Sequence, residues 1–167
     1  MRANDPHAAQ GSRRFRTHRQ GHMHIIWDGV PRPVRTVVQP YVKRFAPILP
    51  LWVETLRICF QAAPESCPSA IASTLISHEY RQLRVSFHPA YLIQEEYSQE
   101  LTVIHEFVHG HVAGMWDVFN SLLEATVGED DPLELWATEE WRRSEESCVT
   151  DLEHGIARLL GMKAPTS

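Results

Sequence analysis

Cysteine is scarce in this chain. The 167 residues include three cysteines, Cys59, Cys67 and Cys148, an odd number without C-x-x-C spacing. A disulfide framework and a cysteine-rich zinc knuckle both need paired cysteines, so the sequence indicates neither of them. Cys59 and Cys148 lie in apolar patterns. Because free cysteine behaves as a small hydrophobic residue, we expect both in the core.

Long hydrophobic runs are absent as well. No stretch of about 18 apolar residues occurs, and residues 1–10 are polar. The sequence therefore indicates neither a membrane-spanning helix nor a secretory signal. We expect a cytoplasmic protein without a membrane partner. With 43% hydrophobic residues, the chain suits one domain, which we place at residues 22–167.

A strong charge of one sign is also lacking. The net charge is −5 with histidine neutral, most arginines lie in the first 44 residues, and acidic residues concentrate after residue 94. Residues 1–21 have almost no apolar side chains, which predicts a disordered basic tail. This tail could bind nucleic acid weakly, but a solvated tail is the favoured interpretation, so we expect no strong nucleic-acid partner.

The chain is organised around residues 105–109, which read H-E-x-x-H. On a helix, His105 and His109 lie on one face, where both imidazoles can bind one Zn²⁺ with Glu106 beside the metal. The alternative is a pair of ordinary helix histidines, one hydrogen-bonded in the core and one solvated. His111 points about 200° away from His109 and is expected at the surface.

The surroundings of the motif predict a helix. No proline occurs between residues 95 and 115, and apolar residues recur at helical spacing: Leu101, Ile104, Val108 and Val112. Residues 114–123 are expected to continue as apolar helix or loop, and residues 128–132 as an acidic turn. A last helix is predicted at residues 137–160, with a buried stripe formed by Cys148, Val149, Leu152, Ile156 and Leu159.

The segments before the motif make the predicted fold class α+β. After an extended proline-rich stretch at 30–34, a short helix is expected at 36–46 with Pro40 in its first turn. Three strand-like runs follow, and the last two form a hairpin with Arg81 and Gln82 at its tip; the runs are residues 51–61, 71–80 and 83–88. We therefore expect a short antiparallel sheet of about three strands.

An edge strand of this sheet beside a catalytic cleft could hold an extended peptide by main-chain pairing. His88 and Tyr91 could then face the cleft. The favoured interpretation is that these two side chains pack or cap the end of the sheet.

Catalytic zinc takes three protein ligands and keeps one position for water. The pattern H-E-x-x-H-x-x-G-x-x-H would need histidine at position 115, which is Met115, so that class is excluded. Glu145 and Glu146, at the front of the last helix, are the candidates for the third ligand, and the sequence does not decide between them. The remaining glutamates of this helix are interpreted as solvated, namely Glu139, Glu140 and Glu153.

Residues 105–109 after a three-stranded region, and the run E145-E-S-C-V-T-D-L about 35 residues downstream, resemble the small single-domain gluzincin metallopeptidases of bacterial and phage proteins. The resemblance covers about residues 36–161. It implies a thermolysin-like core in which the sheet, the active-site helix and a glutamate helix follow one another. It also implies peptide or protein substrates, zinc bound by His105, His109 and Glu145 or Glu146, and Glu106 as general base.

The expected reaction is peptide hydrolysis. Zn²⁺ would lower the pKa of its bound water towards about 7, and Glu106 would take the proton and pass it to the leaving amine. The oxyanion-stabilising residue stays open among His88, Tyr97, His111, His154 and Arg142. The main alternative function is a non-catalytic domain, either zinc-stabilised or metal-free, that binds a peptide or partner; a structural zinc site would have four protein ligands.

Overall fold

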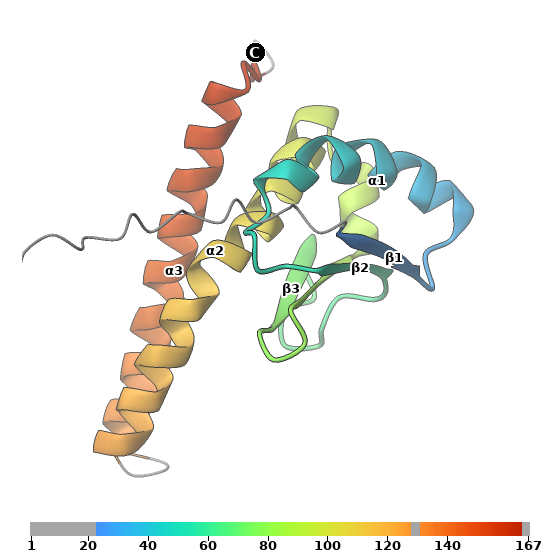
Figure 1. Cartoon of the computed structure of the whole chain (residues 1–167). Helices are drawn as coiled ribbons and strands as arrows, with labels where there is room; N and C mark the ends of the chain where they lie inside the picture. The colour runs from blue at the N-terminus through green and yellow to red at the C-terminus, as the bar shows by residue number, and fades with distance from the viewer. Residues whose placement is uncertain (1–22, 128–130, 165–167) are drawn as a thin grey trace, which may run out of the picture.

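The computed structural model describes residues 23–127 and 131–164, and this part of the chain has an α+β fold (Figure 1). It contains a four-stranded mixed sheet, three α-helices and two short 3₁₀ segments. The predicted basic tail at 1–21 and most of the predicted turn at 128–132 lie outside the described residues. The elements in chain order are β1 His24–Asp28, α1 Arg32–Phe45, β2 Thr55–Phe60, β3 Ala72–Ser77, β4 Gln82–Phe87, α2 Glu96–Thr126 and α3 Pro132–Leu159.

The sheet order is β1-β2-β4-β3. The predicted hairpin of β3 and β4 is confirmed, because these two strands pair antiparallel, but its turn lies at 78–81 and Gln82 pairs with Ser77 within the sheet. The prediction of three antiparallel strands was wrong, since β1 adds a fourth strand and the pairs β1–β2 and β2–β4 are parallel. Parallel neighbours need a crossover connection, and α1 supplies it between β1 and β2.

Helix α1 begins at Arg32, four residues before the predicted start, so the predicted extended stretch at 30–34 is largely helical. Pro33 lies in the first turn, where its missing N–H has no helical partner to lose. Pro40 consequently lies inside the helix rather than in its first turn. The helix packs on the core with one stripe, formed by Val34, Val38, Val42 and Phe45.

The core lies between one face of the sheet and the helices. Alternate residues of β2 and β4 are fully buried on this face, and α2 adds the stripe that carries Ile104 and Val108. Val112 is buried as predicted, whereas Leu101 is only half-buried. Cys59 is buried, as expected. No helix within the described ranges is long and apolar enough to cross a membrane.

Helices α2 and α3 form a long antiparallel pair that extends past the sheet (Figure 1). Helix α2 continues through residues 114–123 to Thr126, so these residues, expected as helix or loop, are helical. Helix α3 begins at Pro132, five residues before the predicted start, and Asp131 caps it by accepting a hydrogen bond from the Leu133 N–H at 2.8 Å.

The predicted buried stripe of α3 is confirmed in part, because Val149 is fully buried and Ile156 packs half-buried against the core. Cys148 and Leu152 are exposed, and Leu159 is 89% exposed. The buried residues of α3 are Val149, Glu153 and Ala157, which repeat every four residues, so Glu153 and Ala157 take the places expected for Leu152 and Leu159. The face that packs on α2 is therefore rotated from the most apolar face, and a glutamate lies within it.

This register gives a stability prediction. Val149→Ala should lower the free energy of unfolding by about 1.5–3 kcal/mol, because the side chain is fully buried and its removal leaves a cavity. Leu159→Ala, on the same helix, should change it by less than about 0.5 kcal/mol. Urea unfolding of the two variants measures both values. An equal loss of unfolding free energy in both variants would indicate that Leu159 is packed as well, as the sequence pattern predicted.

Candidate metal centre

Helix α2 carries the H-E-x-x-H motif where the helix crosses the sheet. Gly110, the residue after His109, lies close to the chain that precedes β2. A Cβ on Gly110 would lie 3.2 Å from Pro50 Cγ, a tight contact that would push Pro50 away by a few tenths of an ångström. The indole N–H of Trp52 also donates to the Gly110 carbonyl at 3.2 Å. The segment before β2, with Pro50 and Trp52, thus contacts α2 at the residue that follows His109.

Three possible metal ligands converge at this place: His105, His109 and Glu146. The two histidine Nε2 atoms are 3.3 Å apart. Glu146 reaches His105 Nε2 with one carboxylate oxygen at 3.3 Å and His109 Nε2 with the other at 3.8 Å. Tetrahedral zinc with bonds of about 2.0–2.1 Å separates its ligand atoms by about 3.3 Å, so this group has the spacing that zinc requires.

The other ring nitrogen of each histidine also faces a carboxylate. His105 Nδ1 is 2.9 Å from Glu153 Oε2, and His109 Nδ1 is 3.2 Å from Glu145 Oε1. A carboxylate that accepts from Nδ1–H leaves Nε2 free for a metal and fixes the ring orientation. Glu145 therefore lies on the far side of the His109 ring from the point where the three donors meet.

The interpretation of Glu153 as a solvated helix residue was wrong, because it is only 7% exposed and bonds to His105. A signal for it exists in the sequence. Glu146 and Glu153 are seven residues, or about two turns, apart, so they share one helix face. The prediction from the sequence missed that these two glutamates share a face, because it placed the buried face along Cys148 and Leu152. Glu139 and Glu140 pair with arginines on the exposed side of α3.

Removing the Glu153 carboxylate should weaken zinc binding. We expect Glu153→Ala to lower zinc affinity by about 10–100-fold, because the His105 ring loses the partner that orients it. Glu140→Ala, an exposed glutamate of the same helix, is the matched control and should leave affinity unchanged. Competition with a chromophoric chelator measures both. Equal affinities for the two variants would show that Glu153 does not support the centre.

The charges of the centre favour a cation. Burial lowers the pKa of His105, but its hydrogen bonds to Glu146 and Glu153 and the charge of Glu106 outweigh burial and raise it to about 10. The hydrogen bond from His105, opposed by burial, holds the pKa of Glu146 below its usual value. The carboxylates that stabilise a proton on His105 would equally stabilise Zn²⁺ between the donors.

Glu106 lies on the sheet side of α2 and is 5% exposed. The Thr74 hydroxyl of β3 donates to Glu106 Oε2 at 2.6 Å. Burial raises the pKa of Glu106, although the Thr74 hydrogen bond and the charges of His109 and His105 act against the rise. A carboxylate with a raised pKa is a stronger base.

An aromatic cluster sets the register of α2 against α3. Phe119 stacks on Trp141 with ring centroids 4.7 Å apart and 20° between the planes, and Trp116 packs against both. Trp116 and Phe119 lie about two to three turns beyond His109 on α2, and Trp141 lies about one turn before Glu145 on α3. The packing of these three rings opposes sliding of α3 along α2, and this keeps Glu145 and Glu146 opposite His109.

The other residues considered from the sequence lie elsewhere. His88 is fully buried, with Nε2 3.1 Å from Ser73 Oγ and Nδ1 3.1 Å from the Gln61 carbonyl, and Tyr91 is buried as well. Both pack at the sheet end, as expected. His111 and His154 are exposed and each has a ring nitrogen within 2.8 Å of a backbone carbonyl. Arg142 bonds to Glu139 on α3.

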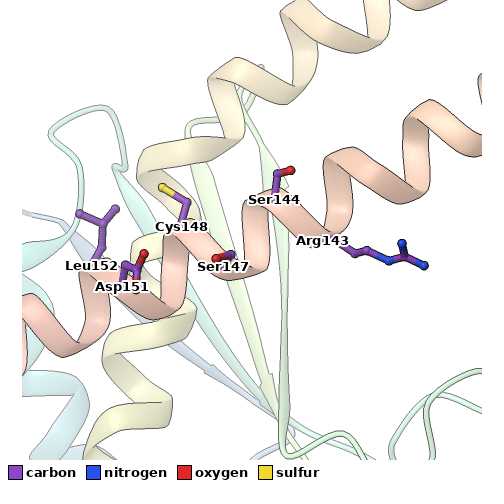
Figure 2. A pocket seen from close by; sticks show the side chains of 6 residues that line it. All are labelled: Arg143, Ser144, Ser147, Cys148, Asp151 and Leu152. Carbon is purple, nitrogen blue, oxygen red and sulfur yellow. The ribbon is translucent and has the colours of Figure 1, made fainter.

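A pocket of about 620 Å³ lies on the outer side of α3 (Figure 2). At 100° per residue, its lining residues lie mainly on the opposite side of the helix from Glu146 and Glu153. It is therefore separate from the metal centre. Its lining consists of Arg143, Ser144, Ser147, Cys148, Asp151 and Leu152.

Comparison of the chain with protein-family profiles, with curated proteins and with solved structures finds no match. Any functional conclusion therefore depends on the chemistry of the site itself.

Proposed function

We propose that this protein is a zinc-dependent metallopeptidase of the gluzincin type. The observation that carries the proposal is the meeting of two histidine nitrogens and the Glu146 carboxylate at zinc spacing. Within the described residues this group has three members, and three protein ligands with one open position are typical of catalytic zinc, whereas structural zinc has four. The order of sheet, H-E-x-x-H helix and glutamate helix supports a thermolysin-like core.

The proposal assigns a task to each residue. His105, His109 and Glu146 hold the metal, which when bound supplies Lewis-acid polarisation of a carbonyl and a lowered pKa of water. Glu153 and Glu145 orient the two imidazoles through Nδ1. Glu106 takes a proton from the attacking water and delivers it to the leaving amine nitrogen, so its carboxyl returns to the ionised form at the end of the cycle.

The edge of the sheet suggests how a substrate would be held. The Ile71 carbonyl accepts from the His88 N–H at 2.9 Å, so Ile71 faces β4. Main-chain groups alternate sides along an antiparallel strand, and those of Ala72, Thr74 and Ile76 consequently point to the free edge of β3. An extended peptide pairing with this edge would run beside α2 at Glu106. The proposed substrates are therefore unfolded or unstructured peptide segments.

The test is cleavage of a library of unstructured peptides by the zinc-loaded protein, read by mass spectrometry. Fragments should appear with zinc, disappear when a chelator removes the metal, and return when zinc is added back. A stably folded protein that contains a cleaved sequence should stay intact, because its chain cannot extend along β3. Zinc binding without fragments from any peptide would contradict the proposal and favour a non-catalytic zinc domain.

A further inference from the structure

Thr74 connects the sheet to the proposed general base. Its side chain lies on the face of β3 that packs on α2, opposite Val85 of β4. Its hydroxyl lies 2.6 Å from Glu106 Oε2 and 3.2 Å from the Glu106 main-chain carbonyl. A hydroxyl has one proton to donate, and the shorter contact to an ionised oxygen is the stronger hydrogen bond.

The contact matters because Glu106 is almost fully buried and has little water to restrain or solvate it. Among the described residues, Thr74 is the side chain that hydrogen-bonds to its carboxylate. Because Oε2 already accepts from Thr74, Oε1 is the freer of the two oxygens to accept a proton. Without the hydroxyl, the carboxylate could rotate about its side-chain bonds. A misplacement of about 1 Å in a catalytic group can cost about 10²-fold in rate.

We propose that Thr74 is a positioning residue that holds the Glu106 carboxylate in its reactive orientation. The proposal rests on the peptidase function proposed above. It adds that Thr74 contributes both to substrate binding and to positioning of the base. Its main chain points to the free edge of β3, and its side chain holds the Glu106 carboxylate. A peptide that pairs with the edge of β3 at Thr74 would therefore lie beside the residue that holds the Glu106 carboxylate.

Two substitutions separate this role from a general effect on folding. Thr74→Val removes the hydroxyl but keeps a β-branched side chain of nearly the same size, so the strand is retained. Thr74→Ser keeps the hydroxyl. We expect Thr74→Val to lower kcat by about 10–100-fold, with KM and zinc content unchanged. Thr74→Ser should recover most of the activity.

A double variant tests whether Thr74 acts through Glu106. In the Glu106→Gln background, adding Thr74→Val should cause no further loss of kcat, because the group that it positions no longer transfers protons. An additional 10-fold or larger loss in that background would overturn the proposal. So would wild-type kcat in Thr74→Val, an equal loss in Thr74→Ser, or loss of zinc.

The outcome also separates this inference from the function on which it rests. If wild-type protein cleaves peptides, Glu106→Gln does not, and Thr74→Val cleaves at the wild-type rate, only the positioning role fails. If wild type and Glu106→Gln show the same rate with zinc bound, the peptidase proposal fails and the positioning role fails with it.

Discussion

Glu106→Gln should reduce peptide cleavage by about 10²–10⁴-fold, the range expected when a general base is lost. Glutamine has nearly the same size, and its amide oxygen can still accept from the Thr74 hydroxyl, so packing between α2 and β3 is preserved. Its amide cannot take a proton from water at neutral pH. The loss should appear in kcat, measured on a peptide that the wild type cleaves.

Zinc content is the control for this variant. Glu106 is not among the three converging ligands, so Glu106→Gln should bind zinc as the wild type does. Full activity in the variant would show that Glu106 is not the base.

His109→Ala should lose both zinc and activity. The substitution removes one of three ligands and leaves Glu145 without its imidazole partner. The drop in zinc affinity should exceed the loss of about 10–100-fold expected when only a ligand-orienting carboxylate is removed. Zinc affinity from chelator competition, together with peptide cleavage at saturating zinc, measures the effect.

The matched control is His111→Ala, two residues further along the same helix. His111 is exposed, and its Nε2 lies 2.6 Å from the Ile48 carbonyl rather than near the metal ligands. This variant should keep zinc and activity. Retention of zinc by His109→Ala, or its loss in His111→Ala, would contradict the assignment of ligands.

The motif helix was predictable because its information is local. A five-residue motif and an apolar stripe at helical spacing place His105, Glu106 and His109 relative to one another without any knowledge of the fold. The hairpin of β3 and β4 was predictable for the same reason, since two alternating runs flank a polar tip. The α+β class followed from the order of these segments.

The parallel part of the sheet was not predictable from such patterns. Strand β1 has five residues, and the alternation of its side chains is too short to distinguish it from the extended stretch around it. Strand β3 comes between β2 and β4 in the sequence but lies at the edge of the sheet, so that β4 becomes the parallel neighbour of β2. The alternation of side chains along a strand shows which of them face the core, but it does not show in which direction the neighbouring strand runs.

The supporting residues of the metal centre depend on tertiary packing. Glu145 and Glu146 were both candidates, and only the rotation of α3 against α2 brings Glu146 to the two Nε2 atoms and Glu145 to an Nδ1 atom. Glu153 was misread because the buried face of α3 is not its most apolar face. The contact of Thr74 with Glu106 joins residues 32 positions apart and has no sequence pattern.

The most direct measurement of the central claim is the metal content of purified protein, for the wild type and for Glu146→Ala and Glu145→Ala separately. The geometry predicts about one zinc per chain in the wild type, retained in Glu145→Ala and lost in Glu146→Ala. No zinc in the wild type, even when zinc is offered at neutral pH, would contradict the metal centre. It would leave a metal-free binding domain as the function to test.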